Sequence, residues 1–455
     1  MRTRAMRRVT ARYTWDRLRV SFWFTPAIMA VAAIALAWAM YALDARVPNE
    51  AIQGSRLILS GGVDQLRSML IDIATTVLAT AGVVFTLLTL PLSTVAAQYG
   101  SRLLRVFLSD RTTQIVLGMF VGTFVYCVVA ALFILPVDIE PASPQLTATL
   151  GLYLMMATFG SLVVLIQHIS TMLQAPNIAA AAGAQLLSVI RVETTEEDRV
   201  VDEAGKADRG ALLPLPATPG HLIYVRETGY IQTVDPALML TFARENDLLI
   251  RLLRKPGAFV RPGEAVAMVW PPERIGEQQD KQIRRAFRVG NQRTPTQDVE
   301  CAVNQLVEMA VRAMSPAIND PFTAMTCLDH IGNGLALFAQ QGEESLNTYD
   351  PDGRLRLVFE PVTFNELLDA AFNMLRHAGC DNASVLLHML TVIGGIGQAA
   401  KTAEARQALR HHVGLIEAES LAGALIAADR QRIKELAREL EKTLTASDAV
   451  IDSTG

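Results

Sequence analysis

Four long runs without a charged residue constrain this chain more than any other feature of its sequence. A helix of about 20 apolar residues is long enough to cross the roughly 30 Å hydrocarbon core of a lipid bilayer. Tryptophan and tyrosine lie near the two ends of the first run, where such rings favour the membrane interface. The sequence therefore predicts four transmembrane helices, over Phe22 to Leu43, Ile73 to Leu92, Ile115 to Leu135 and Leu146 to Ile166.

The composition fits a membrane protein, since 51% of the 455 residues are hydrophobic. The formal net charge of −4 provides no general attraction to nucleic acid, so we expect no nucleic-acid partner. The four cysteines are far apart in the sequence and form no C-x-x-C motif. They predict neither a disulfide framework nor a zinc site, and we expect no metal and no cofactor.

Arginine placement predicts the orientation. The segment before the first run holds seven arginines and one acidic residue, whereas the loop between the third and fourth runs holds only Asp138 and Glu140. The loop after the second run is again basic. Because short cytoplasmic loops gather Lys and Arg, we expect both termini, and everything after about Gln167, in the cytoplasm.

One face of the second predicted span is rich in small and hydroxyl residues. These residues recur at alternating steps of four and three, which places them on one side of a helix. The face has two interpretations: a seam for close helix packing, or the lining of a water-filled path in an oligomer. The predicted span holds no Asp, Glu, Lys or Arg that would indicate an ion relay. The face comprises Thr75, Ala79, Gly82, Thr86, Thr89, Ser93 and Ala96.

The segment "SRLLRVFLSDR", from Ser101 to Arg111, alternates arginines with apolar residues. This pattern suits a helix at the inner membrane surface, where Arg102 and Arg105 would contact lipid phosphates. The alternative is that these arginines only anchor the loop on the cytoplasmic side.

The fold class we predict is mainly α, with a small mixed α/β module between the membrane helices and a helical cytoplasmic domain. In the module, short β-rich stretches alternate with Pro-Gly turns, and Asp235 precedes Pro236 as the N-cap of a helix. The predicted parts are a basic N-terminus (1–20), the transmembrane domain (21–175), a helix and linker (176–208), the module (209–275), the helical domain (276–447) and a tail (448–455).

Helical patterns continue after the module, interrupted by one predicted hairpin in "NTYDPDGRLRLVF". The last of them is expected to divide near Ser420. The predicted helices are Glu277 to Val289, Thr296 to Met314, Pro321 to Gln341, Phe364 to His377, Asn382 to Ala399 and Ala403 to Leu444.

The segment "SPAINDPF", from Ser315 to Phe322, joins two of these helices. Pro316 stops the preceding helix, and Asp320 followed by Pro321 is typical of a helix start, so a sharp corner is the first interpretation. The alternative is a cytoplasmic polar site formed by Glu308, Arg312, Asn319 and Asp320. No nucleotide-binding, metalloprotease or hydrolase motif is present, so no catalytic residue is predicted. An enzyme is therefore the less favoured hypothesis.

Several stretches together resemble the bacterial predicted membrane proteins grouped as domain of unknown function 2254. They are "SFWFTPAIMA", "AAQYGSRLLRVFLSDR", "GYIQTVD" and, above all, "QRTPTQDVECAVNQLVEMAVRAMSPAINDPFTA". The resemblance covers almost the whole chain. It implies an integral inner-membrane protein with a large cytoplasmic part, and it supplies no activity from which catalytic residues could be assigned.

These observations lead to three functional hypotheses. The first is a homo-oligomeric inner-membrane protein that acts as a channel or in a transport-like way and is regulated by its cytoplasmic domains. The second is a membrane-anchored sensor or scaffold that binds a cytosolic protein or ligand. The third is a membrane-bound enzyme.

Overall fold

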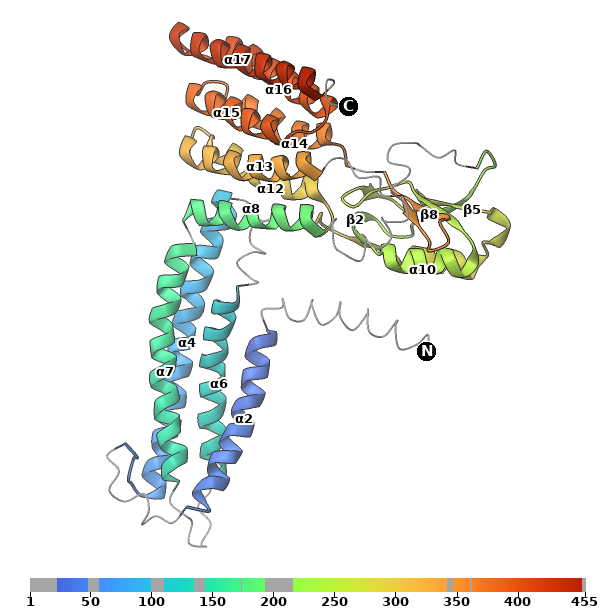
Figure 1. Ribbon diagram of the computed structural model, residues 1–455. Helices are drawn as coiled ribbons and strands as arrows, with labels where there is room; N and C mark the ends of the chain where they lie inside the picture. Colours follow the sequence, from blue (N-terminus) through green and yellow to red (C-terminus); the bar gives the residue numbers. More distant parts are fainter. Residues whose placement is uncertain are drawn as a thin grey trace. The chain divides into compact units, whose positions relative to one another are not determined.

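The computed structural model describes residues 23–47, 57–99, 110–134, 144–172, 174–192, 216–341, 347–360 and 362–451. Contacts within the chain divide it into two compact units, Met1–Asn177 and Ile178–Gly455. We call them the membrane unit and the C-terminal unit. Figure 1 shows the order of their elements along the chain.

The membrane unit is a bundle of four long helices. All four are long and apolar enough to cross a membrane, which confirms the four predicted transmembrane helices. The second helix begins at Val63 and not at Ile73, so the predicted start was too late and Asp72 lies within the helix. The helices are α2 (Phe24–Asp44), α4 (Val63–Tyr99), α6 (Arg111–Phe133) and α7 (Gln145–Met172).

Polar side chains inside this bundle are paired with one another or with helix ends. The carboxylate of Asp44, at the end of α2, accepts hydrogen bonds from the backbone N–H of Leu146 (3.0 Å) and Thr147 (2.9 Å) at the start of α7. In the middle of the bundle the hydroxyls of Thr123 and Thr158 lie 2.8 Å apart. Because lipid offers no hydrogen bonds, such pairing is what lets these groups lie inside a membrane helix bundle.

The C-terminal unit contains two small sheets. The five-stranded sheet has the order β1-β5-β3-β8-β7, with β8 parallel to β3, and the three-stranded sheet has the order β4-β2-β6. Their shared core includes Ile223, Ile231, Ile250 and Val266, all fully buried. The elements are β1 (His221–Tyr224), β2 (Gly229–Val234), α10 (Pro236–Asn246), β3 (Leu249–Leu252), β4 (Phe259–Val260), β5 (Ala265–Trp270), η1 (Pro272–Arg274), α11 (Glu277–Arg284), β6 (Phe287–Gly290), β7 (Thr348–Tyr349) and β8 (Leu355–Val358).

Three strands, β6, β7 and β8, join these sheets from beyond the predicted 209–275 segment. The helix predicted over Glu277 to Val289 ends at Arg284, because residues 287–290 pair with β2 as strand β6. The predicted hairpin in "NTYDPDGRLRLVF" is confirmed, and its strand β8 pairs with β3. Pairing with a strand that is distant in the sequence thus overrode the local helical pattern at β6.

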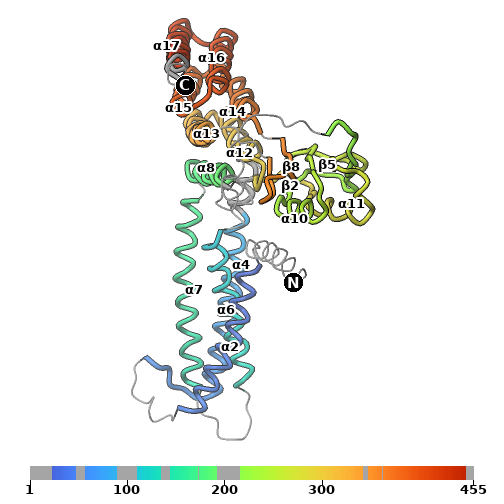
Figure 2. The backbone as a smooth tube through the Cα atoms, turned by 45° about the vertical axis from the view of Figure 1, so that its right-hand side comes forward, coloured from blue at the N-terminus to red at the C-terminus, as the bar shows by residue number. Residues whose placement is uncertain are grey.

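The other helices of the C-terminal unit stack in layers. Figures 1 and 2 show α12 and α13, then α14 and α15, then α16 and α17 as successive helical hairpins, with α8 (Ala175–Val192) against the first. The predicted helices are confirmed, and the last divides between Ala422 and Ala427, just after the expected Ser420. Their bounds are α12 (Val299–Ala313), α13 (Pro321–Gln341), α14 (Phe364–Ala378), α15 (Ala383–Ala399), α16 (Ala403–Ala422) and α17 (Ala427–Ile451).

Candidate functional site

The predicted polar face of α4 points away from the other described helices of the membrane unit. Leu70, Val77 and Val84 of α4 are fully buried in the bundle. With 3.6 residues per turn, Thr75, Ala79, Gly82, Thr86 and Thr89 fall on the opposite side of the helix, and all of them are exposed. We call these five residues, together with any on the same side, the α4 face.

The hydroxyl protons on this helix are used within the helix itself. Each threonine donates to a carbonyl one turn earlier: Thr75 to Ile71 (2.9 Å), Thr86 to Gly82 (3.1 Å) and Thr89 to Phe85 (3.1 Å). Thr76 and Thr80 do the same over 2.8 Å. A hydroxyl whose proton is donated inward keeps its oxygen lone pairs as acceptors. The exposed side of α4 therefore presents oxygen acceptors.

Asp72 continues the α4 face toward the N-terminal end of the helix. It lies three residues before Thr75, so it extends the alternating steps of three and four, and it is exposed. Sequence reasoning excluded it because the uncharged run begins at Ile73. The step pattern, followed one position back, was the signal that would have included it.

The structure does not test three of the residues predicted in and after the second span. Arg102 and Arg105 lie outside the described residues, and the side chain of Ser93 lies outside the described side chains. Contact with lipid phosphates therefore stays a prediction for the two arginines.

The four residues of the predicted cytoplasmic site make separate local contacts. Arg312 pairs with Glu308 one turn earlier on α12 (3.1 Å), and both are partly exposed. Asp320 accepts a hydrogen bond from the backbone N–H of Thr323 (3.1 Å), which confirms its capping role at the start of α13. Asn319 is exposed and takes the left-handed backbone conformation with φ of 49°, which Asn tolerates better than most residues. A pocket that joins all four stays a prediction.

Backbone hydrogen bonds support the interpretation of "SPAINDPF" as a corner. The N–H of Asn319 donates to the carbonyl of Ser315 (2.8 Å), and that of Asp320 donates to Ala313 (2.8 Å). These bonds use carbonyls at the end of α12 that would otherwise lack helical partners. The tight turn and the Asp320 cap then set the start of α13 directly after α12.

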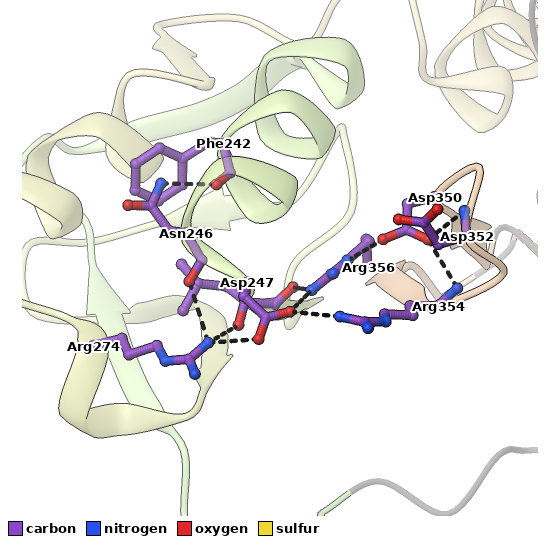
Figure 3. Close-up of polar contacts among 9 residues, drawn as sticks. Phe242, Asn246, Asp247, Arg274, Asp350, Asp352, Arg354 and Arg356 are labelled. Carbon is purple, nitrogen blue, oxygen red and sulfur yellow. Dashed lines mark hydrogen bonds and ion pairs between the residues drawn. The ribbon is translucent and has the colours of Figure 1, made fainter.

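Sequence reasoning missed a charged cluster around Arg356, which Figure 3 shows in close-up. Arg356 of β8 donates to Asp350 (2.7 Å) and to Asp247 (2.8 Å), and Asp247 also accepts from Arg274 (2.7 Å). The hydrogen bonds from Arg274 and then Arg356 lower the pKa of Asp247 to about 2. Every charge named here has an opposite partner, so the cluster ties the β7–β8 hairpin to the end of α10.

A second missed cluster lies inside the longest of the stretches that carry the family resemblance. Arg293 forms a bidentate pair with Asp298 (2.7 and 2.8 Å), and Asp298 also caps α12 through the N–H of Cys301 (2.9 Å). The hydrogen bond to Asp298 raises the pKa of Arg293. Gly257, with φ of 90°, lies so close that any side chain there would meet the Asp298 carboxylate. These contacts fix the sheets to α12 and have the character of structural support.

His412 of α16 is fully buried against Phe372 of α14. Neither ring nitrogen has a hydrogen-bond partner among the described residues, although an Asp369 carboxylate oxygen lies 3.5 Å from Nε2. Burial lowers the pKa of His412 to about 4. The imidazole is therefore neutral at neutral pH, which makes it a sensitive point in the packing between α14 and α16.

Four apolar helices of spanning length followed by a mixed α/β region and stacked helices define the class as a membrane protein. Residues 19–394 match the family described as "Predicted membrane protein (DUF2254)", and the chain belongs to this family. Uncharacterized proteins of Mycobacterium tuberculosis and Mycobacterium bovis are each 26% identical over 369 residues, which cover 79% of this chain and 69% of the relative. No solved structure matches the chain at a significant level.

Proposed function

We propose that the protein is a homo-oligomer of the bacterial inner membrane in which the α4 faces of several copies line a polar path for a solute or ion. The observation that carries the proposal is the direction of the α4 face. It lies opposite the buried side of α4, and among the residues that the structure describes no other helix covers it.

Other exposed positions of the bundle show what a lipid-facing surface in this protein looks like. Val31 and Trp38 of α2 and Val163 of α7 are large, apolar and at least 64% exposed. The α4 face carries a row of threonines and Gly82, where an added Cβ would meet no atom within 4 Å. Exposed large apolar residues lie on or beside this face as well: Ile71, Leu78, Val83 and Phe85. Small residues allow close approach of a second helix, and hydroxyl oxygens suit water or a solute better than lipid tails.

Packing alone is the competing explanation of the α4 face. A dry seam between copies would use the small residues in the same way and would conduct nothing. The two explanations differ in their response to a larger apolar side chain at Thr86, because a dry seam loses assembly whereas a lined path loses flux.

The proposed topology places both termini and the C-terminal unit in the cytoplasm. The arginine-rich N-terminal segment supports this orientation, because positively charged segments stay on the cytoplasmic side. On intact cells, a membrane-impermeant maleimide should label the exposed position 60 in Ser60→Cys. Three of the four native cysteines are buried, so the background label is low. Labelling that requires permeabilised cells would contradict the orientation.

The flux proposal is tested with the full-length protein in liposomes. Wild-type protein should release trapped ions or small solutes, and Thr86→Leu should reduce this release while the oligomer stays intact in size-exclusion chromatography. Leu87→Ile is the matched control, because Leu87 is exposed on the same helix but lies off the α4 face. Wild-type protein that releases no ion or solute would overturn the proposal and leave the sensor or scaffold hypothesis. Loss of the oligomer with Thr86→Leu would favour the dry seam.

A further inference from the structure

Asp72 sits at hydrocarbon depth in the bundle. Asp44 at the end of α2 caps the start of α7 through the N–H of Thr147. Leu70 of α4 packs on Gly151 of α7, because a Cβ atom added at Gly151 would lie 2.7 Å from the Leu70 side chain. At 1.5 Å per residue, Asp72 therefore lies roughly 9 Å from the level of Asp44 toward the middle of the bundle. The 21 residues of α2 span about 31 Å, so this is nearly a third of the way across.

Among the described residues, the carboxylate of Asp72 has no partner although it lies well inside a helix of spanning length, whereas Arg46, Asp64 and Arg111, for which no partner is seen either, lie at helix ends. Arg67, one turn earlier on α4, donates to the carbonyl of Ala131 (3.3 Å), and Asp44 caps α7. Asp110 caps α6 and contacts His168 (3.0 Å). Among the described residues, Asp72 has no ion-pair partner and is exposed on the side of the bundle.

A carboxylate at this depth is not stable against lipid tails. A charged side chain inside the hydrocarbon region costs several kcal/mol unless it meets water, a counter-charge or a hydrogen-bond donor. Because Asp72 shares the α4 face with the threonines, the path proposed above would supply the water. The position of Asp72 is thus consistent with a water-filled path and is difficult to explain by a lipid-facing helix.

We infer that this path is selective for cations and that Asp72 is the group that selects them. The inference rests on the proposed function and adds the substrate class. From Asp72 to Thr89 the helix carries no basic residue. The threonine oxygens on this stretch present acceptors because their protons are donated inward. Oxygen acceptors and one carboxylate per copy form the environment that hard cations prefer and that repels anions.

In the alternative explanation, Asp72 contacts a hydrogen-bonding group of the neighbouring copy and not water or a cation. A protonated Asp72 could share a hydrogen bond with a hydroxyl of a second α4 in a dry interface. Such a contact would stabilise the oligomer and would give no selectivity. The two cases are distinguished by measuring ion selectivity and oligomer stability on the same variants.

The test is a recording across a planar bilayer that contains the full-length protein, with a tenfold KCl gradient. Wild-type protein should prefer K⁺ over Cl⁻. In Asp72→Asn this preference should fall roughly fivefold or more, because one charge close to the path is removed from every copy. Asp72→Glu should keep the preference. Leu87→Ile is again the control, since Leu87 is exposed on the same helix but lies off the α4 face and should leave the preference unchanged.

A second variant keeps the inference testable if Asp72→Asn assembles poorly. In Asp72→Cys, a negatively charged thiosulfonate reagent should restore cation preference and a positively charged one should reverse it, whereas wild-type protein should respond to neither.

A conducting wild-type protein that is not cation-selective would overturn the inference and leave the proposed function standing. So would a conducting Asp72→Asn protein with unchanged selectivity. Wild-type protein without any current would overturn both.

Discussion

In the C-terminal unit the buried charged side chains of the sheets have partners of opposite charge, whereas Asp72 in the membrane unit has none among the described residues. Arg356 pairs with Asp350, and Arg293 pairs with Asp298. Those pairs join segments of the fold, and their geometry accounts for their presence. A charge whose position the fold does not explain is a better indicator of function than a charge that completes a contact.

The same contrast holds within the membrane unit. The hydroxyls of Thr123 and Thr158 bond across the interior, whereas those of the α4 face bond only into their own helix. Interior hydroxyls thus serve packing, and the face hydroxyls leave their acceptors exposed. The predictions below would break or sharpen this division between supporting and functional polar groups.

The largest effect is expected from Asp298→Ala. This change leaves the partly buried guanidinium of Arg293 without its bidentate partner and removes the α12 cap, and it should lower the free energy of unfolding by about 2–4 kcal/mol. This loss is measured by chemical denaturation of the full-length protein, with hydrogen exchange in α12 as the signal. Glu300→Ala is the control: Glu300 contacts the same arginine at 3.2 Å but is partly exposed, and we expect at most about 1 kcal/mol. Equal effects of the two would refute the supporting role of Asp298.

The next effect is a pH dependence caused by His412. Its pKa is about 4 in the folded protein, below its ordinary value of 6.5, so the unfolded chain binds the proton first as the pH falls. Between pH 7 and pH 5 the free energy of unfolding should therefore decrease by about 2 kcal/mol. The groups that face the ring are Phe372, Asp369, Arg376 and His411.

Calorimetry on the full-length protein at both pH values measures this dependence. In His412→Phe the contribution should disappear, whereas His411→Phe, at the exposed neighbouring position, should retain it. An unchanged pH dependence in His412→Phe would show that other groups cause it.

A smaller loss is expected from Asp44→Ala in the membrane unit. Asp44 accepts hydrogen bonds at the start of α7, so its removal exposes unpaired N–H groups and should destabilise the bundle by about 1–2 kcal/mol. The shift of the thermal midpoint in detergent reports this loss. Asp44→Asn keeps one acceptor oxygen and should shift the thermal midpoint less than Asp44→Ala. A larger shift for Asn than for Ala would contradict the capping role.

The smallest effect on stability is expected from Thr86→Leu. The side chain is exposed in the single chain, and its hydroxyl bonds only to Gly82 of the same helix. The thermal midpoint in detergent should shift by an amount equivalent to less than about 0.5 kcal/mol in the free energy of unfolding, although flux is reduced. A large destabilisation would show that Thr86 supports the fold, and it would weaken the functional interpretation of the α4 face.

Much of the helical fold could be predicted from sequence because its signals are local. Asp235 before Pro236 and Asp320 before Pro321 mark helix starts that the structure confirms. The helix Pro321–Gln341 has the predicted bounds. By contrast, β6 was predicted as the end of a helix, since its strand character depends on pairing with β2, more than 50 residues earlier.

The candidate site was predicted in part. The steps of three and four from Thr75 to Thr89 identified the α4 face, but they gave no information on which side of the helix the bundle covers. Counting only uncharged residues also placed the start of the span after Asp72, although the helix begins at Val63.

The sequence by itself determined the four apolar helices and most helices of the C-terminal unit, because length, hydropathy and capping act between neighbouring residues. Only the tertiary structure decided that the α4 face is directed outward and that Asp72 has no partner among the described residues. It also decided that Arg356 meets Asp247, which is 109 positions away in the chain. Such contacts depend on which surfaces pack together, and no local pattern contains that information.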